Sequence, residues 1–529
     1  MNSNIDIIII GSGPSGVSAA FPLVDAGLRV LMLDVGKKKK TEYIATNYLN
    51  LRQNDPHQSQ WMLGKNLHAL RAKAAVSPKL RIPELSYVFD GYHENLKIKN
   101  SDFTLVGSLA AGGLSNAWGA GVAQFSAAEF ASFPFTLHDI EASYAAVCQR
   151  IGISGKSDDD LSAYFGVDNN ALAPVAMDEI HHRLFSAYNK KKSKLNARGF
   201  RMGRSRVAVL TADKESRKAC TLSGNCLWGC FNRAIYSAAD DLEKLKTYSN
   251  FFYQSGFLAN ELIKHNEEWQ VNGTNTLDGQ YTFFRAKKII LAAGTLSSTK
   301  IAAKALEITT PIKLLSSPTA AFLLWMPGMF GAQRKSGFGL GQLSFTLRCN
   351  DCNVFGSTFA TNGIPIAEFA SHVPLRRANA LKILSVLLDS CVVGNVFLPG
   401  HLTNAYMQLG SNDELLVSGN FSEAVAPIMN EVAAQLRKNF LPLGGVVLPG
   451  SFTVGRPGGD IHYAGTFPMR KEPVTGETDA LGQIKGLQNV YIVDGAALPI
   501  LPEKSHTLTI MANADRVAKQ LIHTVSKSL

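Results

Sequence analysis

A glycine-rich turn close to the start of the chain constrains the fold more than any other feature. Residues 5–10 are isoleucine at every position except the second, and they run directly into Gly-Ser-Gly-Pro-Ser-Gly at residues 11–16. Beyond the turn, apolar residues recur at helical spacing from Val17 to Val24. This order of apolar run, glycine turn and helical periodicity predicts a buried parallel strand followed by a helix.

Each glycine of the turn has its own role in a dinucleotide-binding motif. Gly11 makes the tight turn, Gly13 lets the backbone approach a pyrophosphate, and Gly16 lets helix and strand pack closely. Pro14 and Ser15 lie at the start of the helix, where free N–H groups and the positive end of the helix dipole face the phosphate. The motif therefore predicts dinucleotide binding.

A second apolar strand, residues 29–33, ends at Asp34, 23 residues after Gly11. At this distance a carboxylate can accept hydrogen bonds from the ribose hydroxyls of a dinucleotide. Its negative charge would repel a 2′-phosphate, so Asp34 disfavours NADP. FAD and NAD both remain compatible with this motif.

Three further segments have the composition of cofactor contacts. Residues 107–121 are too rich in glycine for a helix interior and too apolar for a surface loop, so close approach to a flat ligand would explain them. One buried strand ends in small residues at Gly294, and another runs into Asp494 and Gly495. His506 then precedes a segment whose apolar residues fall on one helical face.

The order of these motifs resembles the glucose-methanol-choline (GMC) flavoprotein oxidoreductases. The resemblance rests on the turn at 11–16, Gly-Gly-Leu-Ser-Asn-Ala-Trp at 112–118, the strand end at Gly294, His-Tyr-Ala-Gly-Thr at 462–466, and the run from 493 to 512. The glycine segment and the paired histidines look like the sugar-oxidising, pyranose oxidase-like branch. The resemblance is weakest between about 310 and 450, where that family keeps its variable substrate domain.

The resemblance implies FAD as the cofactor. The pyrophosphate would lie at residues 11–16, the adenosine ribose at Asp34, and the isoalloxazine ring against residues 112–118. Some relatives attach the flavin covalently through a histidine near the position of Ala117, and because alanine cannot form that bond we expect non-covalent FAD. The expected cofactor-binding residues are Gly11, Gly13, Pro14, Ser15, Gly16, Asp34, Gly112, Gly113, Ser115, Asn116, Ala117, Gly294, Asp494, Gly495, Thr507 and Leu508.

Two histidines carry the chemistry that the resemblance implies. Alcohol oxidation needs a base for the hydroxyl proton, and imidazole suits this role because its unperturbed pKa is about 6.5. Flavin N5 takes the hydride. By resemblance, His462 is the general base and His506 hydrogen-bonds the substrate oxygen. Thr507 and Leu508 begin the last helix, whose N-terminus would stabilise charge on the reduced flavin and lower the pKa of His506.

Cofactor motifs at both ends of the chain predict two interleaved domains, of the α/β and α+β classes. We expect a discontinuous, Rossmann-like FAD-binding domain of GMC or p-hydroxybenzoate hydroxylase-like architecture, formed by residues 1–130, 205–312 and 452–529. Residues 131–204 and 313–451 would form the substrate-binding domain. An antiparallel sheet is predicted in it from alternating runs at 339–348, 354–361, 404–409 and 414–417.

Charge and cysteine content narrow the classes of partner. The 53 Lys and Arg residues exceed the 42 Asp and Glu residues by 11, but no basic stripe is interleaved with aromatic residues, so we expect no nucleic-acid partner. Cys220, Cys226 and Cys230 match neither zinc nor iron–sulfur spacing well, even with Cys349 and Cys352 added. We therefore expect a structural loop and no metal.

Two features bear on the compartment. The 7 cysteines are an odd number, and the N-terminus lacks the charged region and cleavage site of a secretory signal, so we expect a cytoplasmic protein. Residues 314–333 carry no charge and leave a membrane-spanning helix open. Their prolines and glycines favour a buried strand and loop, or an apolar substrate channel.

The sequence as a whole predicts an FAD-dependent oxidoreductase that oxidises the CH–OH group of a sugar, polyol or other alcohol, with oxygen, a quinone or a redox protein as electron acceptor. A hydrophobic or aromatic alcohol remains an alternative substrate, and with it peripheral contact with a membrane. A nicotinamide or flavin enzyme of different chemistry, such as a ketone reductase or desaturating dehydrogenase, and a non-catalytic nucleotide-binding protein also remain open. Oxidase and dehydrogenase are not distinguished.

Overall fold

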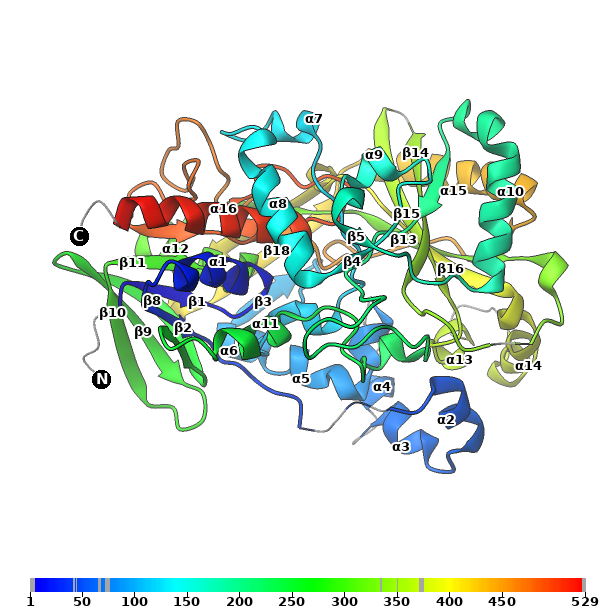
Figure 1. Ribbon diagram of the computed structural model, residues 1–529, viewed down its shortest axis with the longest axis horizontal. Coiled ribbons are helices and arrows are strands. Elements are labelled where there is room, and N and C mark those ends of the chain that lie inside the picture. Colours follow the sequence, from blue (N-terminus) through cyan, green and yellow to red (C-terminus); the bar gives the residue numbers. More distant parts are fainter. Residues whose placement is uncertain are drawn as a thin grey trace.

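A computed structural model describes residues 5–40, 43, 45–64, 68–71, 77–333, 335–349, 351–370 and 375–525. Near the two chain ends lies a five-stranded parallel sheet (Figure 1). Its central strand is formed by four isoleucines, all of them buried, and pairs in register with a strand on each side. The strand order is β22 (Val490–Ile492), β11 (Lys288–Leu291), β1 (Ile7–Ile10), β2 (Val30–Leu33) and β7 (Phe251–Gln254).

Helices cover this sheet because the apolar strands are buried on both faces. The first helix, α1 (Pro14–Asp25), follows β1 directly through the glycine turn, as the sequence predicts. It packs against the last helix, α16 (Thr507–Val525), which also contacts α8 (His138–Ile151). Figure 1 shows α16 lying beside α1 and α8, so the two ends of the chain meet in one α/β unit.

The segment from 250 to 284 divides between two sheets. Its first strand, β7, joins the parallel sheet next to β2. The remainder forms an antiparallel meander, which packs against α12 (Thr295–Ala305). The meander strands are β8 (Phe257–His265), β9 (Glu268–Asn275) and β10 (Tyr281–Ala286).

A second large sheet lies at the opposite end of the molecule (Figure 1). One of its faces packs on helices α10 (Glu179–Asn196) and α15 (Val425–Phe440), with Phe200, Phe322 and Phe345 in the shared core. The strand order is β19 (Val446–Val447), β13 (Thr319–Trp325), β16 (Cys391–Phe397), β15 (Cys352–Ala360), β14 (Gly341–Cys349) and β6 (Arg201–Arg204), with β20 (Thr453–Val454) pairing with β13.

The four alternating runs expected to form one antiparallel sheet lie in two sheets. The first two are β14 and β15 of the large sheet. The other two are β17 (Thr403–Leu409) and β18 (Leu415–Phe421). They belong to a mixed sheet, in which β18 pairs in parallel with β3 (Ile98–Ser101). Alternation sets the burial of each strand but not its partner, so the sequence could not separate them. The mixed sheet has the order β21 (Tyr463–Ala464), β12 (Ile312–Ser316), β17 (Thr403–Leu409), β18 (Leu415–Phe421) and β3 (Ile98–Ser101).

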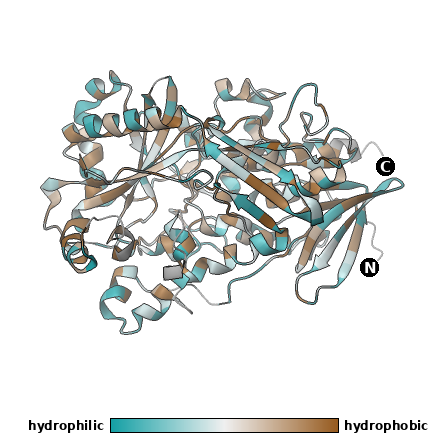
Figure 2. Cartoon of the chain, turned by 180° about the vertical axis from the view of Figure 1, so that it is seen from behind, coloured by the Kyte–Doolittle hydropathy of each residue, from teal (hydrophilic) through white to brown (hydrophobic). Residues whose placement is uncertain are grey.

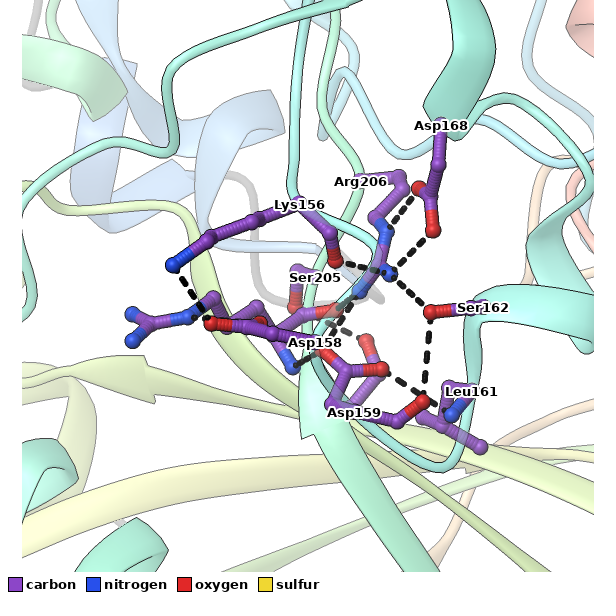
Figure 3. Close-up of polar contacts among 10 residues, drawn as sticks. Lys156, Asp158, Asp159, Leu161, Ser162, Asp168, Ser205 and Arg206 are labelled. Atoms are coloured by element: carbon purple, nitrogen blue, oxygen red, sulfur yellow. Dashed lines mark hydrogen bonds and ion pairs between the residues drawn. The ribbon is translucent and has the colours of Figure 1, made fainter.

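The segment from 131 to 204 contributes to both ends of the molecule. Helix α8 packs into the core of the parallel sheet, whereas α10 and β6 belong to the second large sheet. Between them, the buried Arg206 side chain binds Asp159 and Asp168 at 2.7–2.8 Å (Figure 3). The segment therefore links the two ends, and the domain boundaries expected from the sequence remain a prediction.

The uncharged segment at 314–333 forms the end of β12, a second strand and a loop. It contains β13, and a short 3-10 turn follows at Pro327–Met329. Among the described residues, no helix has the length and apolar content needed to cross a bilayer. Most helices at the surface carry hydrophilic and hydrophobic residues in alternating bands (Figure 2), as expected for helices that bury one face.

Candidate active site

One large cavity, of about 1460 Å³, runs from the glycine turn to the second large sheet. Pockets for drug-sized ligands measure about 300–1,000 Å³, so this cavity has room for a dinucleotide together with a second molecule. The expected site residues that line it are Gly11, Gly13, Pro14, Ser15, Asp34, Gly113, Ser115, Ala117, Gly294, His462, Asp494, Gly495, His506 and Thr507.

The three glycines of the first turn have different surroundings. At Gly11 a Cβ atom would lie 2.5 Å from the Ala292 carbonyl oxygen, and φ is +102°. At Gly16 it would lie 2.0 Å from the Gly11 carbonyl oxygen. At Gly13 it would meet no atom of the described residues within 4 Å. Gly11 and Gly16 are therefore required by the protein's own packing, whereas the space beside Gly13 is open to a ligand.

The start of α1 offers hydrogen-bond donors to that space. Gly13 is the N-cap, and no side chain caps the helix. The Ser15 hydroxyl lies in the same turn, is buried, and has no hydrogen-bond partner among the described residues. Helix N-termini with free donors bind phosphate groups. The open cradle at Gly13 and the unpartnered Ser15 hydroxyl therefore fit a pyrophosphate.

Asp34 lies at the end of β2, in the wall of the cavity. Its carboxylate accepts hydrogen bonds from the hydroxyls of Ser12 and Tyr253. Burial raises the pKa of Asp34 to about 6. A carboxylate has about four acceptor positions, so ribose hydroxyls can still bind here. Ser12 also accepts from the Gly112 N–H at 3.0 Å and so joins the turn to the second glycine segment.

The segment at 112–118 is held by hydrogen bonds to the start of α11 (Ala238–Leu245) and to its N-cap, Ser237. The Ser115 hydroxyl donates to the Gly112 carbonyl at 2.6 Å and accepts from the Ala238 N–H at 2.9 Å. The Asn116 carboxamide accepts from Ser237 at 3.0 Å. These bonds turn the backbone at Gly113 and Ala117 toward the cavity, while Gly112 and Asn116 stabilise the loop without lining the cavity.

Asp494 ties two strands of the parallel sheet together. Its carboxylate accepts from the Gly294 N–H at 2.9 Å and the Ser298 hydroxyl at 2.6 Å, and also from the Ala496 N–H at 3.0 Å. Burial raises the pKa of Asp494 to about 6. Gly294 and Gly495 adjoin it in the cavity wall. The structure thus gives Asp494 a positioning role at the carboxyl ends of β11 and β22.

His462 and His506 face one another in the cavity. Their ring centroids are 5.2 Å apart and the rings are perpendicular. His462 also contacts the Phe397 ring at 5.3 Å. His506 directly precedes α16, where Thr507 lines the cavity and Leu508 is fully buried in the core. The last helix and the strand at β21 therefore bring together two histidines that are 44 residues apart in the sequence.

Burial makes both imidazoles weak bases. It lowers the pKa of His462 to about 4 and, together with the neighbouring His462, the pKa of His506 to about 3. Both rings are therefore neutral near pH 7. Nδ1 of His506 is buried and has no hydrogen-bond partner in the part of the chain that the structure describes. The His462 side chain is 24% exposed, so it remains accessible from the cavity.

Sequence reasoning missed Asp460, which lies beside His462. Its Oδ2 atom is 3.6 Å from Nδ1 of His462, and the side chain is fully buried. Ser316 donates to the carboxyl group through its hydroxyl at 2.7 Å and Ser317 through its N–H at 2.8 Å. Burial raises the pKa of Asp460 to about 7. The sequence did contain one signal for this residue, because Asp460 is an acid two positions before the candidate base His462.

Ile461, between these two residues, has φ of +61°. A β-branched residue rarely adopts this left-handed conformation, which costs roughly 1–3 kcal/mol and is found most often at functional sites. The turn places the Asp460 and His462 side chains next to one another. No sequence pattern predicts such strain at an isoleucine. Phe397 and Tyr253, the other missed contacts of the site, also had no sequence signal.

Cys220, Cys226 and Cys230 lie in a loop outside the histidine pair. All three are free thiols, and Cys226 accepts a hydrogen bond from the Gly339 N–H at 3.3 Å. Within the described part of the chain, no three His, Cys, Asp or Glu side chains are grouped closely enough to hold a metal ion. Burial raises the pKa of Cys226 to about 12, so this thiol is protonated near neutral pH.

Comparisons with known proteins bear on this geometry. Residues 458–514 match the GMC oxidoreductase family model. The crystal structure of pyridoxine 4-oxidase from Mesorbium loti is similar over 98% of this chain and 99% of that chain, with a TM-score of 0.60 and 14% sequence identity. No curated protein sequence matches the chain.

The matched segment contains Asp460, both histidines and Asp494. The solved structure, at this low identity, supports the fold alone: an α/β unit with a second, sheet-rich part. The match of residues 458–514 to the family model confirms the resemblance to the GMC oxidoreductases over this segment, and the fold is shared with pyridoxine 4-oxidase over nearly the whole chain.

Proposed function

We propose that the protein oxidises the CH–OH group of an alcohol to a carbonyl with non-covalently bound FAD. The observation that carries the proposal is the pair of neutral imidazoles, 5.2 Å apart, in a cavity that continues to the glycine turn. A neutral imidazole can accept the proton of a substrate hydroxyl, and a second one can fix the position of the oxygen. Bound FAD would supply the hydride acceptor.

The residues around the cavity fit FAD at each expected contact. The open space at Gly13 and the unpartnered Ser15 hydroxyl suit the pyrophosphate, and Asp34 suits the adenosine ribose. Ala117 borders the cavity and has no group that could form a bond to the flavin. These features support a dissociable cofactor.

The chain's own residues would move the proton. His462, which lies against Phe397 and is accessible from the cavity, takes the hydroxyl proton. The resulting imidazolium is next to Asp460, whose ionised carboxylate would stabilise it at 3.6 Å. His506 has the lower pKa and stays neutral, so it serves as hydrogen-bond partner of the substrate oxygen.

An absorbance spectrum of the purified protein tests the cofactor, and anaerobic mixing with alcohols tests the reaction. We expect flavin bands near about 370 and 450 nm, released on heat denaturation, and bleaching by at least one alcohol. Reoxidation by air, by a quinone or by a redox protein then identifies the electron acceptor. A spectrum without flavin after reconstitution with FAD, or a flavin that no alcohol bleaches, would contradict the proposal.

A specific surface favours a hydrophobic alcohol delivered from a membrane as a second candidate. Helix α14 (Arg377–Leu387) exposes Ile383 by 51% and Val386 by 52%, and Ile383 also borders the cavity. Lys382 directly precedes Ile383 and Arg376 is the N-cap of the same helix, and both would contact anionic lipid. Co-sedimentation with anionic vesicles should weaken in an Ile383→Ser, Val386→Ser double variant; equal binding of both proteins would remove this candidate.

A further inference from the structure

The face of the second large sheet that is turned away from its helices forms one wall of the cavity. On β14, β15 and β16 the residues Ser344, Ser357 and Asn395 stand directly opposite one another in register. All three line the cavity. Residues directly opposite in a sheet share one face, so these three form a polar row across three strands.

On β15 and β16 the polar row lies between two apolar pairs of residues. Phe355 is in register with Phe397 on one side of it, and Phe359 with Val393 on the other. These four residues also line the cavity. Phe397 contacts His462, and residues i and i+2 of a strand are about 7 Å apart. Asn395 therefore lies one strand repeat from the residue that packs on the candidate base.

The hydrogen bonds of the row leave donors unused. The hydroxyls of Ser205, Ser344 and Ser357 form a chain with O···O distances of 2.8 and 2.9 Å. Because two hydrogen bonds join three hydroxyls, one of the three protons is not used within this series, and no other acceptor for it is found among the described residues. The first hydroxyl of this series belongs to Ser205. Its backbone position is fixed because the next residue, Arg206, is held by the buried ion pairs drawn in Figure 3.

Asn395 adds a further hydrogen-bond donor, its amide NH2 group, and the contacts of the side chain show which amide atom is the nitrogen. Its Oδ1 atom accepts from the Ser357 N–H at 3.1 Å, and because an N–H can only donate, the other amide atom must be Nδ2. Among the described residues, none accepts a hydrogen bond from Nδ2. A free amide donor beside aromatic rings calls for a ligand acceptor.

We propose that this polar row is a substrate subsite, which binds a hydrogen-bond acceptor on a largely flat, apolar alcohol while the carbinol lies at the two histidines. The inference rests on the proposed function and narrows its substrate class. It favours an aromatic or heteroaromatic alcohol with a ring nitrogen, carbonyl or second hydroxyl over a polyol, since on β15 and β16 the polar row is flanked on both sides by apolar, mostly aromatic side chains.

The test compares two alcohols that differ in a single acceptor. Benzyl alcohol and 3-pyridinemethanol have nearly the same shape, and only the second has a ring nitrogen. With the FAD-loaded protein, we expect 3-pyridinemethanol to have a kcat/KM for flavin reduction about fivefold to tenfold higher than benzyl alcohol. Asn395→Leu should abolish this preference by lowering kcat/KM for 3-pyridinemethanol while leaving benzyl alcohol at or above its original value.

Two further variants keep the result interpretable. Asn395→Asp retains the acceptor for the Ser357 N–H but removes the free donor, so it should lose the preference even if the leucine variant misfolds. Asn404→Leu makes the same change at an exposed position on β17 and should behave like the original protein. A preference unchanged in both Asn395 variants, or no preference in the original protein, would overturn the subsite.

Failure of the proposed function would give a different result. If neither alcohol reduces the flavin, the oxidation is contradicted, and the subsite is then judged by perturbation of the bound flavin spectrum. If the spectral titration shows that 3-pyridinemethanol binds the original protein more tightly than the Asn395→Leu variant, the subsite is still supported. Equal titration curves for the two proteins would overturn it.

Discussion

The cofactor side of the cavity is built from turns, and the substrate side from the face of a sheet. The cofactor side comprises residues 11–15, 113–115, 117 and 494–495, where backbone groups and open space would do most of the binding. The substrate side comprises the polar row and its aromatic neighbours on β14, β15 and β16. Turns impose residue types that are recognisable in a sequence, whereas a sheet face accepts many side chains.

The histidine pair joins the two sides, so changing it should have the largest effect. His462→Ala should retain bound FAD and lower the rate of flavin reduction by about 100-fold or more, because the base is lost while the cofactor contacts are intact. Stopped-flow reduction of the FAD-loaded variant measures this. A rate within threefold of the original would show that the base is another residue and that the histidine pair does not join the cofactor side to the substrate side.

Within the cofactor side, two glycine variants should behave differently. Gly11→Ala meets the Ala292 carbonyl and a positive φ, so it should lower the free energy of unfolding by about 2 kcal/mol or more. Gly13→Ala has φ of −64° and open space, so the apoprotein should change by less than about 1 kcal/mol while FAD binding is lost.

Denaturant unfolding of the two apoproteins and FAD titration measure these effects. Equal destabilisation by both substitutions would show that the space beside Gly13 is a packing requirement like that at Gly11. Retention of FAD by Gly13→Ala would show that the pyrophosphate does not approach this residue.

Substitution of Asp460 tests whether its carboxylate stabilises the imidazolium of His462. A raised pKa means that the carboxyl group ionises only as the pH rises through about 7, so the carboxylate that stabilises the imidazolium is present above that pH. Flavin reduction should therefore increase through about pH 7. Asp460→Asn should be about tenfold slower and should lack this limb, whereas a structural role would lower the rate at every pH without changing the profile.

The cysteine loop should have the smallest effect. Because Cys226 is a protonated thiol near neutral pH and no metal-binding cluster occurs among the described residues, chelators should leave flavin reduction unchanged. Metal analysis of the purified protein should find less than stoichiometric zinc or iron. A stoichiometric metal whose removal lowers activity would contradict the structural interpretation of the loop.

The cofactor side could be predicted closely because its constraints are local. The strand, turn and helix at 7–25 form as expected, and Asp34 and His506 lie in the same cavity as the turn. The substrate side was foreseen only as alternating strands. Alternation specifies which side chains share a face, but the partner strand and register depend on residues far away in the chain. Two of the four runs accordingly pair in a different sheet.

The sequence by itself determined the glycine turns, the first strand and helix, and the histidines that resemble a family motif, because each depends on steric and hydrogen-bonding requirements within a few residues. Only the tertiary structure decided that Asp460 lies beside His462 through a strained Ile461, and that Ser344, Ser357 and Asn395 form one row. Those arrangements depend on long-range strand pairing and burial, which no local pattern records.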